Sequence, residues 1–207
     1  MDHARAVLDF WFGKLPLSPA ALEERMEFWF GGDSSAHVIA ERDAEIRLRF
    51  GPLLARAAQG EIDSWSASPR RLLALILIFD QFSRNAYRGT ARAYAYDHRA
   101  LGLALSGMQL GADAALDAVE RIFFYMPLQH AESREVQDES IAAFRRLLAE
   151  APAQLRPVLE STLAFAQRHH DIVQRFGRFP HRNAVLGRDS TREERAYLQS
   201  GVDNFAQ

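Results

Sequence analysis

One short stretch near the C-terminus concentrates side chains that can bind anions. Residues 175–183 read Arg-Phe-Gly-Arg-Phe-Pro-His-Arg-Asn, and Leu-Gly-Arg follows at 186–188. The glycine suits a left-handed helix end, and the proline prevents the helix from continuing. Guanidinium groups present a planar fork that matches carboxylate and phosphate. The loop therefore binds something negative or pairs with acidic neighbours, and its candidate ligand-binding residues are Arg178, His181, Arg182, Asn183 and Arg188.

A second polar group follows an apolar segment. Asp80 comes directly after the hydrophobic run 72–79, so we expect its carboxylate near the core, where an unpaired charge is costly. Arg84 lies four residues later, which is the spacing of a helical ion pair. Two interpretations stay open. Asp80, Arg84, Asn85 and Arg88 line a ligand site, or Asp80 forms a structural pair while Asn85 and Arg88 cap the end of the helix.

Two further candidates contain histidine. His130 and Glu132 follow a predicted helix end, and both can face one cavity. The favoured alternative has His130 bonded to a backbone group and Glu132 near the next helix N-terminus, where the helix dipole stabilises a carboxylate. His169 lies on the apolar stripe of a predicted helix. This position is typical of a satisfied core histidine, and it is also where a fold can hold a general base.

Other chemistries have less support. No serine shows the setting of a nucleophile elbow, and no nucleotide-type phosphate loop is present. A metal-dependent hydrolase would draw on the available histidines and acids, which are His130, Glu132, His169, His181 and Asp80. No HxxxH, HExxH or HxH spacing supports it, so we expect no metal site. If a reaction is catalysed, His130 or His181 is the candidate acid or base, with Asp80 as its orienter.

Helix signals recur along the chain, and no strand pattern of comparable length is present. Ser18-Pro19 and Ser68-Pro69 each place an N-cap serine before a proline at the first helical position. The expected helices are 4–12, 20–30, 35 to about 51, 70–84, 91–108, 111–126, a helix from 133, 155–176 and 190–198. Helices of this length joined by short turns predict an all-α domain of antiparallel helix pairs. The length favours a single domain over residues 1–207.

Composition restricts the classes of partner. The chain has 207 residues, of which 48% are hydrophobic, and a formal net charge of −2. This charge gives no general attraction to nucleic acid or to an anionic membrane. The longest apolar run is too short to span a bilayer, and the N-terminus lacks a signal sequence. We therefore expect a soluble cytoplasmic protein. The absence of cysteine excludes disulfides and thiolate metal sites.

Four motifs in order along the chain resemble a known family. They are 7–13, Val-Leu-Asp-Phe-Trp-Phe-Gly; 80–85, Asp-Gln-Phe-Ser-Arg-Asn; 125–130, Tyr-Met-Pro-Leu-Gln-His; and the arginine-rich loop from 175 to 188. Together they resemble the bacterial family called domain of unknown function 924. The family usually has proline at Ser83, glutamate at Gln129 and serine at Ala131. The resemblance implies antiparallel helix pairs in a right-handed tetratricopeptide-like superhelical array. It implies no activity, substrate or cofactor.

Two functional hypotheses follow. In the first, the polar motifs converge into a composite pocket of arginine, histidine and aspartate that binds a small anionic molecule. In the second, paired helices form a groove that binds a peptide or partner protein. A purely structural role, in which the charged motifs pair with one another and lock the helix ends, is the competing interpretation. The sequence leaves the oligomeric state open.

Overall fold

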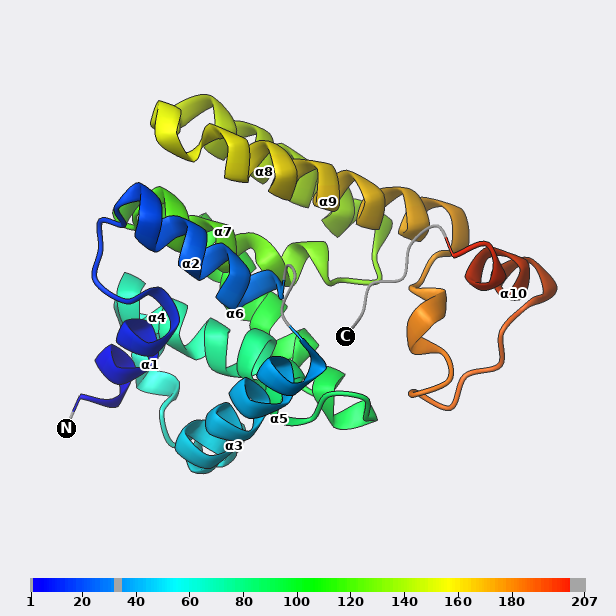
Figure 1. The fold of residues 1–207 in the computed structure, drawn as a ribbon, viewed down its shortest axis with the longest axis horizontal. Helices are drawn as coiled ribbons and strands as arrows, with labels where there is room; N and C mark the ends of the chain where they lie inside the picture. The colour runs from blue at the N-terminus through cyan, green and yellow to red at the C-terminus, as the bar shows by residue number, and fades with distance from the viewer. Residues whose placement is uncertain (1, 32–34, 202–207) are drawn as a thin grey trace.

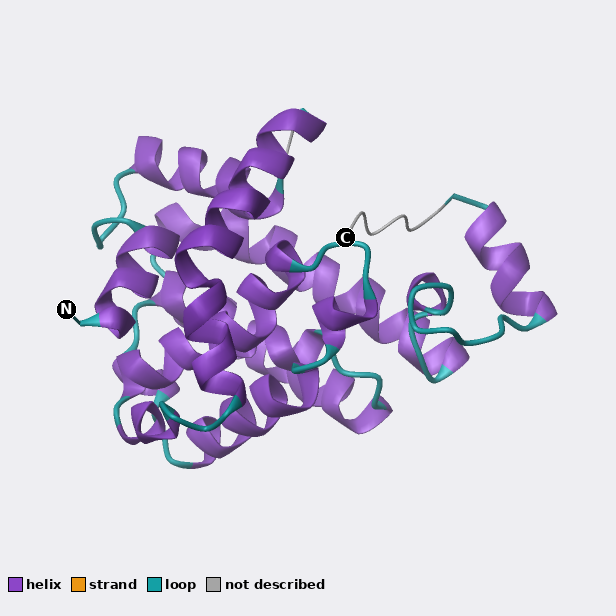
Figure 2. Cartoon of the chain, turned by 90° about the horizontal axis from the view of Figure 1, so that it is seen from below, coloured by secondary structure: helices purple, strands orange, loops and turns teal. Residues whose placement is uncertain are grey.

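The computed structural model describes residues 2–31 and 35–201, and every regular element in these two ranges is helical (Figures 1 and 2). The α-helices are α1 His3–Phe12, α2 Pro19–Phe30, α3 Ala36–Ala58, α4 Pro69–Leu77, α5 Ser83–Ala86, α6 Asp97–Gln109, α7 Ala118–Gln129, α8 Arg134–Glu150, α9 Arg156–Phe176 and α10 Arg192–Gln199. Shorter helical turns are η1 Asp63–Ala67, η2 Ile78–Phe82, η3 Ala91–Tyr94, η4 Asp113–Ala115, η5 Ala153–Leu155 and η6 Pro180–Arg182. The all-α prediction is confirmed.

Ser18 and Ser68 occupy the predicted N-cap positions of α2 and α4, but the side chain of Ser68 makes no capping hydrogen bond. The hydroxyl of Ser18 accepts a hydrogen bond from the amide of Ala21 at 3.2 Å, and that of Ser133 accepts one from Val136 at 3.3 Å. The predicted cap at Ser190 is wrong by one residue. Thr191 Oγ1 accepts from the Glu194 amide at 3.1 Å, while the Glu194 carboxylate accepts from the Thr191 amide at 2.7 Å. This reciprocal pair satisfies two free amides at once.

The apolar run 72–79, most of which belongs to α4, forms the centre of the molecule. All side chains from Leu72 to Phe79 are buried, and α4 contacts α1, α6 and α7. A helix that is hydrophobic on every side must be enclosed by others. The ring of Trp11 lies 5.6 Å from Phe82 and 5.4 Å from Phe123 between ring centroids. Because Phe82 lies between Asp80 and Arg84 in the sequence, its contact with Trp11 holds the helical segment that carries these two polar residues.

The helix after α4 contains a local irregularity at Asp80. The predicted helix 70–84 is helical throughout, but its segment η2 is a π-helical turn between α4 and α5. Asp80 lies in the middle of this turn and is 0% exposed. A π turn inserts one extra residue and so re-aims the side chains around it, and such turns are frequent at functional sites.

Proline does not end helices where the sequence suggested it would. Pro52 lies inside α3 and Pro127 lies inside α7, although the predicted helices ended at about residue 51 and at residue 126. Each proline removes one backbone hydrogen bond. In α7 the residues from Val119 to Gln129, except Arg121, are buried, so packing on several sides holds the helix together across the proline.

Two predicted helices begin later than expected. The segment from Ala91 forms the separate turn η3, and α6 starts only at Asp97. Thr90 does not cap it, because its hydroxyl donates to the carbonyl of Tyr87 at 2.7 Å. Likewise the region from Gly111 forms η4, and α7 starts after Asp117, whose capping box uses Glu120. The break before α6 is what brings Asp97 to the polar site.

Helices α8 and α9 pack side by side and antiparallel, and they cover α7 (Figure 1). The stripe predicted for α9 comprises Val158, Thr162, Phe165, His169, Ile172 and Phe176. Thr162, His169 and Ile172 are buried and Val158 and Phe176 are half-buried, but Phe165 is 41% exposed, so its assignment to the buried face was wrong. Gly177 ends α9 with a φ of 70°, which is a left-handed cap. The chain then forms a C-terminal segment, residues 178–201, that extends beside the helical body in both views (Figures 1 and 2).

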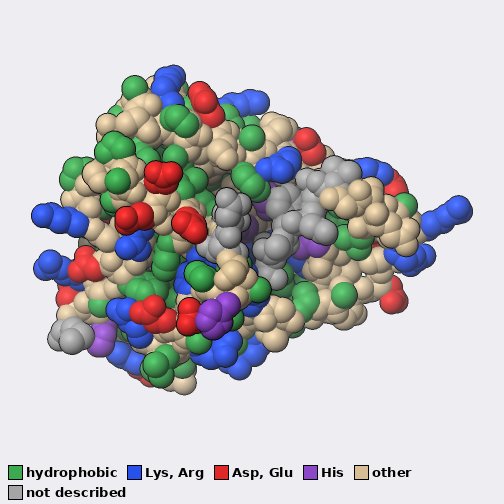
Figure 3. Space-filling view, in the orientation of Figure 1, with side chains coloured by type: hydrophobic (Ala, Val, Ile, Leu, Met, Phe, Trp, Pro, Cys, Tyr) green, Lys and Arg blue, Asp and Glu red, His purple; other side chains and the backbone are tan. Residues whose placement is uncertain are grey.

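The surface has no dominant sign of charge on the face shown in Figure 3, where acidic and basic side chains are interspersed. Among the described residues, no helix is both long and apolar enough to cross a bilayer.

Candidate functional site

Asp80 is the centre of a buried polar network that joins three parts of the chain. Arg84 Nη1 donates to Asp80 Oδ1 at 3.1 Å and to its backbone carbonyl at 2.7 Å, which confirms the predicted pair. His130 Nδ1 lies 2.8 Å from Asp80 Oδ1, and Gln81 Nε2 donates to Oδ2 at 2.7 Å. The expectation that His130 bonds a backbone group was wrong, since its partner is this carboxylate.

The charges around Asp80 fix the protonation of the pair. Burial alone would raise the pKa of Asp80, but the charge of Arg84 and the contact with His130 outweigh it and hold that pKa well below its usual range. Burial, and then the charge of Arg84, lower the pKa of His130. At neutral pH the imidazole is therefore neutral and donates its Nδ1 proton to the ionised carboxylate. This assignment leaves Nε2 as a hydrogen-bond acceptor.

Arg182 comes from the C-terminal segment and meets this network. Its Nη1 donates to the backbone carbonyl of His130 at 3.1 Å and to Asp97 Oδ2 at 3.4 Å. Arg84 Nη2 donates to the same oxygen of Asp97 at 2.9 Å. Two buried guanidinium groups therefore share one carboxylate. Burial, and then the charge of Arg84, lower the pKa of Arg182 to about 10, so Arg182 stays protonated at neutral pH.

The environment of Arg182 leaves one edge of its guanidinium group without an acceptor. Aromatic rings lie near the guanidinium carbon, with Phe179 at 4.4 Å and Tyr94 at 4.8 Å to the ring centroids. The side chain is 3% exposed, yet its Nε and Nη2 donate to no acceptor among the described residues. Within the same residues, Arg84 Nε and Asp97 Oδ1 also lack partners. Buried polar groups of this kind are rare in native folds.

The other predicted arginines are paired with carboxylates. Arg178 donates to both oxygens of Glu194 at 2.7 and 2.9 Å, and Arg188 donates to both oxygens of Glu132 at 2.6 and 2.9 Å. Glu132 directly precedes Ser133, the N-cap of α8, as expected, and it also accepts from the amide of Phe179 at 2.8 Å, so it ties the C-terminal segment to the body. These contacts match the structural interpretation of the loop.

Asn183, Asn85 and Arg88 also have structural partners. Asn183 Nδ2 lies 3.3 Å from Glu194 Oε2. Asn85 Nδ2 donates to Asp43 Oδ1 at 2.8 Å, and Arg88 Nη2 donates to the same oxygen at 3.1 Å. In the structural alternative Asp80 pairs with Arg84, as observed, but Asn85 and Arg88 bind Asp43 in place of the helix end. They bind α5 and the following turn to α3.

Two histidines lie at the edge of the network. The ring of His169 is 6.3 Å from that of His130 and 5.3 Å from that of Phe179, and its Nδ1 lies 2.9 Å from the carbonyl of Phe165. Burial lowers the pKa of His169 to about 3. The ring of His181 is 5.5 Å from Phe179, and burial, followed by the charge of Arg182, lowers its pKa to about 4. Both rings are neutral at physiological pH.

The structure thus divides the predicted site. It brings together Asp80, Arg84, His130 and Arg182, with His169 and His181 near them, and it places Asn85, Arg88, Arg178, Asn183 and Arg188 in separate pairs. Sequence reasoning missed Asp97 and Tyr94. Both lie in the stretch that we expected to be one continuous helix, so no local signal marked them.

Comparisons with known proteins agree with the predicted resemblance. The family model described as "Bacterial protein of unknown function (DUF924)" matches residues 7–202. A solved structure, that of the protein of unknown function ATU0120 from Agrobacterium tumefaciens, is 36% identical, with a TM-score of 0.76 over 96% of this chain and 98% of that one. No curated protein matches the chain. The chain therefore belongs to the bacterial family of unknown function DUF924.

Proposed function

We propose that the protein binds a small anionic ligand at the network formed by Arg182, Arg84, Asp97, Tyr94 and His130. The observation that carries this proposal is the unpaired edge of Arg182. Its side chain is 3% exposed, and Nε and Nη2 meet no acceptor among the described residues. A buried charged group without its full set of hydrogen bonds is costly. An anion bound along this edge would remove that cost.

The free edge has the shape that anion binding requires. Nε and Nη2 of one guanidinium point in parallel, so they can donate side by side to two oxygens of a carboxylate or phosphate. The nearby rings of Phe179 and Tyr94 restrict the orientation of the guanidinium plane. The positive charge of Arg84, which shares Asp97 with Arg182, adds to the attraction. A fixed donor pair loses little entropy when it binds.

His130 is the group best placed to act on a bound ligand. Its Nδ1 is held by Asp80, which fixes the ring and leaves Nε2 as an acceptor. A carboxylate that orients a neutral imidazole is the arrangement of a general base, so the roles suggested for His130 and Asp80 stay part of the proposal. His181 is the second candidate. The π-helical turn at Asp80 supports a functional role for this position.

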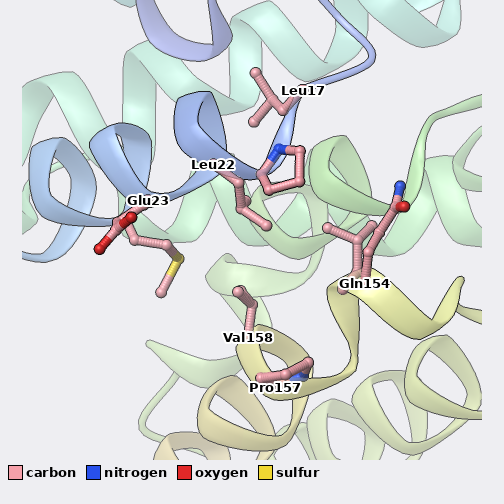
Figure 4. Close-up of a pocket in the computed structure, with 9 residues that line it drawn as sticks. Leu17, Leu22, Glu23, Gln154, Pro157 and Val158 are labelled. Carbon is pink, nitrogen blue, oxygen red and sulfur yellow. The ribbon is translucent and has the colours of Figure 1, made fainter.

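A helical interaction module is the second candidate function. We propose for it the right-handed tetratricopeptide-like arrangement of the helix pairs, in which α7, α8 and α9 pack in succession. An apolar pocket of about 310 Å³ lies between α2 and the start of α9 and is lined by Leu17, Leu22, Met26, Leu155 and Val158 among others (Figure 4). This pocket contains none of the network residues. We favour the network because a buried guanidinium group with two donors that meet no acceptor among the described residues is a stronger sign of a ligand than an apolar hollow.

The metal-dependent hydrolase receives no support from the side-chain positions. Among the described residues, no group of three or more histidine or acidic side chains is arranged to hold a metal ion. We do not include metal chemistry in the proposal.

Replacement of Arg182 tests the proposal. We expect formate and inorganic phosphate to raise the melting temperature of the wild-type protein, and Arg182→Gln to weaken the affinity measured by calorimetry at least tenfold. The lost charge-assisted hydrogen bonds contribute about 1.5–3 kcal/mol each, and about 1.4 kcal/mol corresponds to one factor of ten.

Arg178→Gln is the matched control, because it removes a guanidinium of the same loop that already binds Glu194 through two bonds. This variant should melt at a lower temperature and keep its anion affinity. Equal affinities of the wild-type protein and Arg182→Gln for both anions would disprove the proposed site.

A further inference from the structure

Asp97 carries an unpaired acceptor beside the unpaired donors of Arg182. Its Oδ2 accepts from Arg84 and Arg182, at 2.9 and 3.4 Å. Its Oδ1 is buried and bonds to no donor among the described residues. The contact between the two side chains joins Arg182 Nη1 to Asp97 Oδ2. Oδ1 is the other oxygen of the same carboxylate, and Nη2 is the other terminal nitrogen of the same guanidinium group. Among the described residues, an acceptor without a donor and a donor pair without an acceptor therefore belong to the two members of one ion pair.

The charged side chains in and around the network sum to zero before any ligand binds. Asp80 and Asp97 oppose Arg84 and Arg182, and Glu132 opposes Arg188. The lowered pKa values keep His130, His169 and His181 neutral at physiological pH. A monoanion such as formate would leave one uncompensated negative charge in this buried setting, and a dianion such as a phosphate monoester would leave two, which costs more. A zwitterion would leave none.

We infer that the ligand is an α-amino carboxylate, bound as a zwitterion. Its carboxylate takes the Nε and Nη2 edge of Arg182, and its ammonium group donates to Asp97 Oδ1. This inference rests on the proposed function and narrows it, because it adds a required positive group beside the anionic one. In such a ligand one carbon atom joins the ammonium and carboxylate groups. This short separation suits a site whose donor edge and acceptor oxygen belong to the two members of one ion pair, Arg182 and Asp97.

His130 adds a further acceptor for the same ligand. Its neutral ring presents Nε2, and its backbone carbonyl already holds Arg182 Nη1 at 3.1 Å. An ammonium group has three protons to donate, so it can bond Asp97 and a second acceptor together. An α-hydroxy acid also offers a donor, but it carries no positive charge to face Asp97. A simple carboxylate offers no donor.

Matched ligands distinguish these classes on the unaltered protein. The experiment screens the L-amino acids by calorimetry and then compares each one that binds with the hydroxy acid and the unsubstituted acid of the same carbon skeleton, as in alanine, lactate and propionate. We expect at least one amino acid to bind at least tenfold more tightly than its unsubstituted acid, with the hydroxy acid between them. We also expect Arg182→Gln to weaken all three.

Asp97→Asn tests the protein side, because it keeps the shape of the side chain and removes its charge. Asp97 also holds Arg84 and Arg182, so its replacement can weaken every ligand. The readout is therefore the ratio of the affinity for the amino acid to the affinity for its unsubstituted acid, and not either affinity alone. A general loosening of the site would weaken both ligands and leave the ratio unchanged, whereas loss of the ammonium contact brings the ratio close to one. The comparison of ligands on the wild-type protein gives a result even where this variant does not fold.

The outcomes separate this inference from the proposed function. Binding of the unsubstituted acids and of inorganic phosphate that depends on Arg182, without a preference for the amino acids, would overturn the zwitterion inference and leave the anion site standing. A wild-type protein that binds none of the amino acids, unsubstituted acids or phosphate would overturn both. A preference for amino acids that persists unchanged in a folded Asp97→Asn variant would contradict the assigned role of Asp97.

Discussion

Replacement of Asp80 by alanine is expected to lower the free energy of unfolding by about 3–5 kcal/mol, the range measured when one partner of a buried ion pair is removed. Asp80 is 0% exposed and accepts hydrogen bonds from Arg84, Gln81 and the ring of His130. Without it, Arg84 and Arg182 would share Asp97 as their remaining carboxylate partner. Urea denaturation followed by circular dichroism measures the loss.

Asp9→Ala is the matched control for this change. Asp9 pairs with Arg5 at the same spacing of four residues, but the two side chains are 60% and 80% exposed. Exposed helical pairs contribute less than about 0.5 kcal/mol, so the control should unfold close to the wild-type midpoint. Similar small losses for both variants would show that Asp80 is not a desolvated partner of Arg84.

The stability of the protein is expected to fall steeply as the pH drops below about 6.5, the ordinary pKa of histidine. Burial lowers the pKa of His169 to about 3, and the pKa of His130 is lowered in the same direction. Between the lowered pKa of each histidine and 6.5, the unfolded chain binds a proton that the folded chain does not. Each such histidine therefore lowers the free energy of unfolding by about 1.4 kcal/mol per pH unit in this range, and above pH 6.5 it causes no loss.

Asp80 adds to this loss only at more acidic pH, because its pKa in the folded chain lies below its usual range. Denaturation curves between pH 7.5 and 4.5 give the free energy of unfolding as a function of pH. The slope of this function is expected to be shallower in His169→Gln. It is expected to be unchanged in His37→Gln, which removes a histidine that is 81% exposed. A wild-type profile that is flat from pH 7 to pH 5, about 1.5 units below the point where the linkage begins, would contradict the neutral buried histidines.

The sequence predicted local pairs well and distant ones poorly. The Asp80–Arg84 contact followed from a helical spacing of four, because helix geometry alone brings such residues together. The contact between Asp97 and Arg182 joins residues that are 85 positions apart, and no periodicity encodes it. Asp97 was also hidden by an apolar pattern that read as one helix, whereas the chain breaks before it.

The function of the arginine-rich loop also depends on contacts with residues far away in the sequence. Its composition indicated either an anion site or a set of ion pairs, and residue types alone could not separate the two. The structure gives both outcomes, since Arg178 and Arg188 bind Glu194 and Glu132 while one edge of Arg182 has no acceptor among the described residues. The difference depends on which carboxylates the fold brings within reach. Pro127 similarly lies inside a helix because of the packing around it.

Arginine side-chain NMR tests the anion site at the level of single atoms. The Nε–H resonance of Arg182, identified by its loss in Arg182→Gln, is followed while formate is added to the protein at pH 7. We expect this resonance to shift and then saturate, while the Nε–H resonance of Arg178, which is bonded to Glu194 at 2.7 Å, stays in place. An Arg182 resonance that does not move, or that moves only in parallel with Arg178, would contradict binding of an anion at this edge.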